Sequence, residues 1–160
     1  MSYPEPRHHG ERGEISAAFR PAGTPPDFVS PGGTRTHYLA TTASTGGEFG
    51  LYRVDMPPGA GGPRTHFHRT ISESFFILDG TVRLYDGAQW TDARKGDFLY
   101  VPPGGLHAFG NEADEPASML LLFAPGAPRE EYFEQVSAVA GMTDEERAEF
   151  FLRHDTFWTD

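Results

Sequence analysis

The chain has 160 residues, a length that predicts one domain with a single substantial core. It contains no cysteine, which excludes a disulfide framework, thiolate metal ligands and a cysteine nucleophile. Its formal net charge of −10 disfavours nucleic acid and anionic membranes as partners, and no apolar run approaches the roughly 18 residues of a membrane span. The first residues lack the apolar stretch of a signal peptide, so we expect a cytoplasmic protein.

Two changes of pattern divide the chain into three parts. Residues 1–33 are rich in proline, glycine and charge and predict a partly mobile N-terminal arm. Between residues 34 and 125, short apolar segments separated by turns predict an all-β barrel or sandwich. Asp79-Gly80 and Asp86-Gly87 are typical hairpin turns. The expected strands cover residues 36–42, 49–56, 72–78, 81–85, 89–93, 97–101, 106–110 and 118–123.

Residues 126–160 change to a helical pattern. Apolar side chains recur at helical spacing over residues 129–140 and predict one helix. A capping box at residues 143–146 predicts a second helix ending near residue 154, with Phe151 and Leu152 facing inward. The tail that follows is aromatic, so we expect this extension to pack on the barrel.

Four side chains in the β region fit together as one metal site: His66, His68, Glu73 and His107. Residues i and i+2 of a strand share a face, so His66 and His68 can reach the same ion. Glu73 lies on the next strand, and His107 follows a Pro-Gly turn. Imidazole and carboxylate together favour a first-row divalent metal over calcium or magnesium, and four protein ligands favour iron, manganese, nickel or copper over zinc.

The alternation around Glu73 also indicates a pocket. If Glu73 points into the barrel, Phe75 and Ile77 share its face and, with Tyr100 and Phe109, are candidate lining residues. Ordinary core packing explains each of the four equally well. Three basic residues near the motif strands could orient an anionic substrate, although a solvated face explains them as well: His37, Arg53 and Arg64.

The two stretches resemble the paired sequence motifs of the cupin superfamily. The first motif, G(X)5HXH(X)3-4E(X)6G, is matched at His66, His68, Glu73 and Gly80, whereas Ala60 stands where its leading glycine belongs. The second, G(X)5PXG(X)2H(X)3N, is matched at every position, by Gly96, Pro102, Gly104, His107 and Asn111. The resemblance covers about residues 45–124.

The resemblance implies a cupin-type jelly-roll β-barrel followed by two C-terminal α-helices. One divalent transition metal ion (iron, nickel, manganese, copper or zinc) would be bound inside the barrel by His66, His68, Glu73 and His107. A single motif pair makes the chain a monocupin, a class that commonly dimerises, so a homodimer is expected. The C-terminal helices also look like those of bacterial quercetinase-like cupins.

The function implied is that of a metal-dependent dioxygenase acting on a small aromatic or enolic molecule. Glu73 would be both a ligand and the catalytic residue that accepts the substrate proton. Two alternatives use the same four residues: a non-redox isomerase, cyclase or lyase, and a non-catalytic small-molecule-binding protein. The identity of the metal and the uptake of dioxygen distinguish these functions.

Overall fold

The core of the barrel is formed by strands whose side chains alternate between its inside and its outside. In a computed structural model that describes residues 2–159, β3 (Gly50–Met56) and β10 (Ala117–Ala124) bury every second residue, as expected when successive side chains face opposite sides. Tyr52 and Val54 from β3 pack with Leu121 and Phe123 from β10. This alternation directs one face of the largest sheet into the core.

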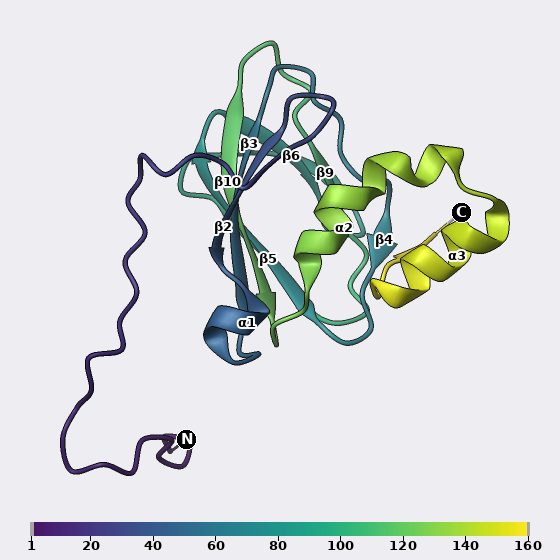
Figure 1. The fold of residues 1–160 in the computed structure, drawn as a ribbon. Coiled ribbons are helices and arrows are strands. Elements are labelled where there is room, and N and C mark those ends of the chain that lie inside the picture. The colour runs from purple at the N-terminus through teal and green to yellow at the C-terminus, as the bar shows by residue number, and fades with distance from the viewer. Residues whose placement is uncertain (1, 160) are drawn as a thin grey trace.

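Two antiparallel sheets and a short strand pair make up the jelly roll (Figure 1). The six-stranded sheet runs, from edge to edge, through β1 (Phe28–Val29), β2 (Arg35–Ala40), β3, β10, β5 (Ser72–Asp79) and β8 (Phe98–Val101). The three-stranded sheet contains β7 (Trp90–Arg94), β6 (Thr81–Tyr85) and β9 (Ala108–Gly110), and the pair joins β11 (Phe157–Trp158) to β4 (His66–Phe67). The all-β cupin-type fold predicted from the sequence is therefore confirmed.

One of the two predicted hairpins is formed, and the other is wrong. Asp86-Gly87 turns β6 into β7, and these strands pair. At Asp79-Gly80 the chain instead leaves the six-stranded sheet for the three-stranded one, because β5 pairs with β8 and β10 while β6 pairs with β7 and β9. Gly80 has a φ of 69° and lies against the backbone of Pro116 and Ala117, where a side chain would clash. The Asp-Gly sequence marks a corner here.

The C-terminal segment is helical and lies beside the barrel (Figure 1). It contains α2 (Arg129–Gln135), a 3-10 helix (Val136–Gly141) and α3 (Asp144–Arg153), and a further short helix, α1 (Thr42–Thr45), follows β2. The predicted capping box is present, since Thr143 and Glu146 exchange side-chain and backbone hydrogen bonds. The predicted inward face of α3 is wrong at Leu152, which is 65% exposed, while Phe150 is buried.

In Figure 1 the N-terminal segment, drawn in purple, runs away from the barrel as an extended arm. Its residues from 2 to 19 are all exposed. No helix in residues 2–159 is both long enough and apolar enough to cross a membrane.

Candidate metal centre

Backbone hydrogen bonds bring the two sequence motifs together. His66 in β4 forms an antiparallel bridge with His107, and each donates its N–H to the carbonyl of the other at 3.0 Å. The N–H of Gly104, in the Pro-Gly turn, donates to the carbonyl of His68 at 2.6 Å. Gly104 has a φ of 83°, a conformation that favours glycine. The histidines of both motifs are thus fixed on neighbouring backbones.

Glu73 enters the same centre from the six-stranded sheet. It lies in β5 between Val101 of β8 and Phe123 of β10. Its Oε2 atom is 3.1 Å from Nε2 of His68 and 2.8 Å from Nε2 of His107. One potential ligand atom from each of the four predicted residues lies within 4.8 Å of the others, and all four side chains are buried. The structure therefore assembles a cluster that could hold a metal ion.

The hydrogen bonds of the three imidazoles fix which ring nitrogen faces the centre. The Nδ1 atoms of His66, His68 and His107 lie 2.8, 2.6 and 3.0 Å from the backbone carbonyls of Arg64, Asp155 and Gly105, respectively. A carbonyl only accepts, so each Nδ1 carries the proton, and Nε2 of a neutral ring presents a lone pair. Lone pairs and an anionic oxygen then face one another. This donor set fits a divalent cation. The cation would attract the lone pairs and the carboxylate oxygen, which otherwise repel one another.

Burial and mutual contacts together set the charges of the cluster. Burial lowers the pKa of His66 to about 4, so its ring is neutral at neutral pH. Burial raises the pKa of Glu73, but contacts with His107 and His68 outweigh it and bring the pKa below the ordinary glutamate value. Burial also opposes protonation of His107, yet the Glu73 carboxylate raises the pKa of His107 overall. The centre therefore contains one ionised carboxylate among buried imidazoles.

The C-terminal segment orients His68. Asp155 provides the carbonyl that accepts from Nδ1 of His68. The Asp155 carboxylate accepts hydrogen bonds from the backbone N–H groups of Arg69 and Thr70 and from the Thr70 hydroxyl, at 2.7 to 3.1 Å. Trp158 of β11 pairs with His66, and their rings lie 5.2 Å apart. Two side chains of the centre thus depend on residues about 90 positions later in the chain.

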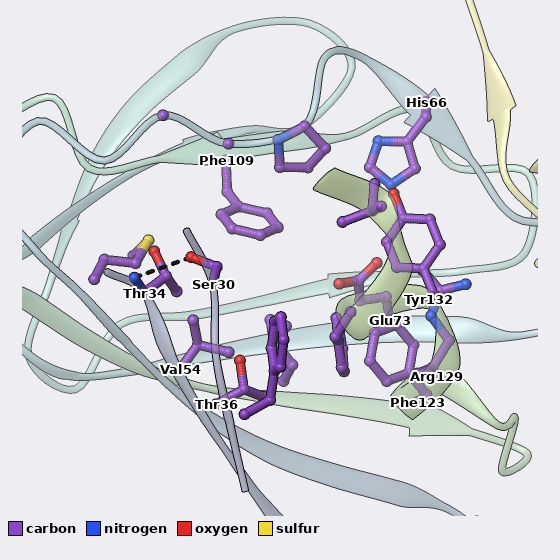
Figure 2. Close-up of a pocket in the computed structure, with 18 of the residues that line it drawn as sticks. Ser30, Thr34, Thr36, Val54, His66, Glu73, Phe109, Phe123, Arg129 and Tyr132 are labelled. Atoms are coloured by element: carbon purple, nitrogen blue, oxygen red, sulfur yellow. Dashed lines mark hydrogen bonds between the residues drawn. The ribbon is translucent and has the colours of Figure 1, made fainter. Parts of the chain in front are cut away.

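A cavity of about 330 Å³ adjoins the cluster. Most of its wall is apolar, and Figure 2 shows His66, Glu73 and Tyr132 at one end and Ser30 and Thr34 at the other. Its volume lies within the range of small-molecule sites. The lining residues are Phe28, Ser30, Thr34, Thr36, Val54, Met56, Gly61, Gly62, Pro63, His66, Glu73, Phe109, Leu121, Phe123, Arg129, Tyr132, Phe133, Val136 and Trp158.

The four predicted lining residues lie in different places. Phe109 lines the cavity. Phe75 and Ile77 share the face of Glu73 but are fully buried in the core, where Phe75 packs against Phe109 and His107. Tyr100 is 55% exposed, outside the core. Glu73, Phe75 and Ile77 thus share the buried face of β5, as the alternation predicts, while β8 directs Tyr100 outward.

The other polar residues singled out in the sequence lie outside the cavity wall. His37 and Arg53 both contact the Asp55 carboxylate, and the Arg64 guanidinium lies 5.5 Å from the ring centre of Trp158. Asn111 is buried and donates to the carbonyls of Pro57 and Glu115, so it holds a loop in place.

Arg129 and Tyr132 of α2 also line the cavity, and no local sequence pattern marks them as site residues. Arg129 is the first residue of an amphipathic helix, where an arginine normally indicates an exposed position. Tyr132 is one of the apolar residues at helical spacing in residues 129–140, and this spacing does not show what the buried face covers.

Residues 52–123 match the family model Cupin_2, described as a cupin domain. The barrel is therefore similar to a cupin domain over these residues. Both motifs lie inside the matched residues, whereas Arg129, Asp155 and Trp158 follow them. The matched region therefore contains the four-residue cluster, and the following segment completes its surroundings.

Known proteins with similar sequences or structures differ in the reactions that their names state. TcmJ, a tetracenomycin polyketide synthase protein of Streptomyces glaucescens, is 25% identical over 127 residues, covering 78% of this chain and 83% of TcmJ. Quercetin 2,3-dioxygenase of Bacillus subtilis (strain 168) is 29% identical over 73 residues, covering 44% of this chain but 21% of that protein. A predicted oxalate decarboxylase from Thermotoga maritima has the same fold, with a TM-score of 0.61 and 19% identity, covering 68% of this chain and 99% of that one.

Proposed function

We propose that this cupin is a metal-dependent enzyme that acts on a small aromatic or enolic molecule as a dioxygenase. One observation carries the proposal: three imidazoles, each oriented by a hydrogen bond from Nδ1 to a backbone carbonyl, converge with a buried carboxylate beside an apolar cavity. His66, His68, Glu73 and His107 are the proposed ligands. Four such ligands leave positions free for a substrate in a metal that accepts five or six.

A bound iron, nickel, manganese, copper or zinc ion would act as a Lewis acid toward an enolate or phenolate oxygen, and a redox-active ion would also promote reaction with dioxygen. The chain supplies the remaining functions. Glu73 lines the cavity as an ionised carboxylate and is the proposed acceptor of the substrate proton. Val54, Phe109 and Leu121 belong to the apolar wall that excludes water from the cavity.

The character of the cavity supports an aromatic or enolic substrate. Its wall has more apolar than polar surface, and Phe109, Phe123 and Phe133 offer ring faces for stacking. Oxalate, named for the Thermotoga protein, is small and dianionic and would leave most of this wall without contacts. The name of the Bacillus protein states a dioxygenase reaction and is the second support for the proposal.

The first experiment is elemental analysis of protein purified without added metal, together with the variants His66→Ala and His37→Ala. We expect near-stoichiometric iron, nickel, manganese or copper in the wild type and in His37→Ala, because His37 contacts Asp55 outside the cavity wall. His66→Ala should lose the ion. An oxygen electrode would then test flavonols and other enols for metal-dependent dioxygen uptake.

Each other outcome has a definite meaning. Zinc that is lost in His66→Ala, without dioxygen uptake by any enol, would replace the dioxygenase with a Lewis-acid isomerase, cyclase or lyase. Ligand binding without turnover would indicate a binding protein. Full metal content in His66→Ala would refute the proposed ligand set.

We also propose a homodimer. Its support is an exposed aromatic group at the β8 edge of the six-stranded sheet, where Phe76 is 40%, Phe98 63% and Tyr100 55% exposed. Large exposed apolar groups of this kind are typical of interfaces. Light scattering of the wild type should give twice the 17.6 kDa chain mass, and Phe98→Ser should shift the mass toward the monomer.

A further inference from the structure

Arg129 is a buried cation for which the structure provides no carboxylate partner. Its side chain is 4% exposed, and none of the ion pairs found in residues 2–159 includes it. One terminal nitrogen donates to the carbonyl of His154 at 2.7 Å. The Nε atom is buried without a hydrogen-bond partner. A guanidinium has five N–H donors, so most of its capacity is unused by the protein.

The surroundings of the guanidinium are aromatic. Its central carbon lies 4.1 Å from the ring centre of Tyr132 and 5.2 Å from that of Phe123. Cation–π contacts offset part of the desolvation of the charge, but a buried charge is normally paired with an anion. Burial accordingly lowers the pKa of Arg129, although an arginine remains protonated. Arg129 therefore lacks an anion.

The cavity contains the space in which that anion could lie. Arg129, Tyr132, His66 and Glu73 all line it, and Figure 2 shows them gathered at one end. Glu73 is the single acidic residue among the lining side chains. When a divalent ion occupies the proposed ligands, Glu73 neutralises one of its two charges, and Arg129 adds a further positive charge. An apolar cavity with this excess charge favours an anionic occupant.

Resting on the proposed function, we infer that Arg129 binds a carboxylate of the substrate and thereby selects carboxylated aromatic or enolic molecules. A planar carboxylate matches the guanidinium fork. The cavity has one basic side chain with permanent charge, Arg129, which suits a monoanion, whereas a phosphate monoester carries close to two charges. The carboxylate would lie at the α2 end of the cavity, and the ring would lie against Phe109.

Arg129 also has a structural contact, the hydrogen bond to His154, so a loss of stability would not by itself test the inference. The decisive quantity is the preference for a carboxylate over a neutral compound of the same shape. If Arg129 had only a structural role, replacing it would change the affinity for both compounds equally.

The experiment is calorimetric titration of the full-length, metal-loaded chain with 2-naphthoate and with 2-naphthamide. The wild type should bind the carboxylate about tenfold more tightly or better, the effect expected of a charge-assisted hydrogen bond. Arg129→Gln, which can still donate to the His154 carbonyl, should bind the two compounds within about twofold of each other. Arg153→Met removes an exposed positive charge from the same segment and should keep the wild-type preference.

Equal binding of the two compounds by the wild type would overturn the inference. So would a preference that survives in Arg129→Gln, or a parallel loss of affinity for both compounds in that variant. If Arg129→Gln does not fold, Arg129→Lys decides: it keeps the charge without the fork, so an unchanged preference overturns the inference and a several-fold decrease supports it. Metal content is measured in every sample.

The same titrations on metal-free protein separate this inference from the proposed function. If the chain holds no metal, the carboxylate preference and its dependence on Arg129 remain measurable. If the preference is absent while metal and dioxygen uptake are present, the inference fails and the proposed function stands.

Discussion

The barrel and the C-terminal segment contribute to the centre in different ways. Residues 52–123 contain all four side chains of the cluster and the backbone bridge that joins His66 to His107. Residues 126–159 contain none of the four, yet they provide the carbonyl that orients His68 and five side chains of the cavity wall, one of which is the ring beside His66. The barrel therefore contains the cluster, and the segment sets its orientation and surroundings.

This difference separates the cluster from the residues that shape the cavity around it. A cluster built on paired strands is rigid and changes little when the substrate changes. The wall formed by α2 and β11 lies outside the matched family region and can vary independently. We therefore expect variants in the barrel to change reactivity and metal content, and variants in the segment to change ligand preference and affinity.

Among the variants that test this difference between barrel and segment, Glu73→Gln in the barrel should have the largest effect. The variant keeps an oxygen ligand but loses the anion and the proposed proton acceptor, so we expect turnover to fall by about 10²- to 10⁴-fold. Metal content should fall less. Parallel measurement of turnover and metal content tests this, with the exposed Glu149→Gln as a control. Turnover that falls only in proportion to metal content would show that Glu73 is a ligand without a catalytic role.

Phe150→Ala should have the next largest effect, on the stability of the C-terminal segment. Phe150 is 2% exposed and packs against Tyr132 and His154 in a second, smaller cluster. Removing a buried phenylalanine costs about 3–5 kcal/mol. Hydrogen exchange should show a loss of protection in α3 before any loss in β3 and β10. Leu152→Ala, at an exposed position of the same helix, should change stability by less than about 0.5 kcal/mol. Equal loss of protection in barrel and segment would mean that they unfold as one unit.

The smallest effect is expected from Asp155→Ala. The carbonyl to His68 remains, but the carboxylate contacts with Arg69 and Thr70 are lost, at a cost of about 1–3 kcal/mol in unfolding free energy. Metal affinity should fall about tenfold, as is typical when the groups that orient a ligand are disturbed. Competition with a chromogenic chelator measures this. Asp155→Asn keeps an oxygen acceptor and suits the positive φ of 49°, so its effect should be smaller.

The pH dependence of the Asp155→Ala effect provides a further check. Burial raises the pKa of Asp155, but hydrogen bonds from Thr70 and Arg69 outweigh it and lower the pKa overall. A lowered pKa means that the stabilisation is complete above the ordinary aspartate pKa of about 4 and is lost as pH falls through the lower native value. The stability difference between wild type and Asp155→Ala should therefore shrink at strongly acidic pH. A difference that is constant with pH would show that the carboxylate charge is not involved.

Local sequence rules predicted the barrel and the four-residue cluster because both depend on short-range patterns. The spacing of His66 and His68 reflects the two-residue period of a strand, and the alternation around Glu73 gave the correct buried face of β5. The capping box at Thr143 is similarly local. Where a pattern is completed within a few residues, the sequence contains most of the information.

The remaining features depend on partners that are distant in the chain. Asp79-Gly80 has a hairpin sequence, but pairing of β5 with β8 and β10 makes it a corner between sheets. Arg129 looks like a surface residue until α2 is placed against the cavity, and Asp155 lies 87 positions from His68. Leu152 lies at a helical spacing that suits either face, and only the packing of Phe150 decides between them. These errors and omissions arise from tertiary contacts that no local rule encodes.

The pairing of β11 with β4 also affects when the centre can form during protein synthesis. A ribosome makes both sequence motifs before it makes Asp155 and Trp158, and chains begin to fold from their N-terminal side. A nascent barrel would therefore have the four side chains of the cluster while His68 and His66 still lacked the carbonyl and the ring that orient them. Tight capture of a metal ion at the proposed centre should accordingly follow the pairing of β11 with β4.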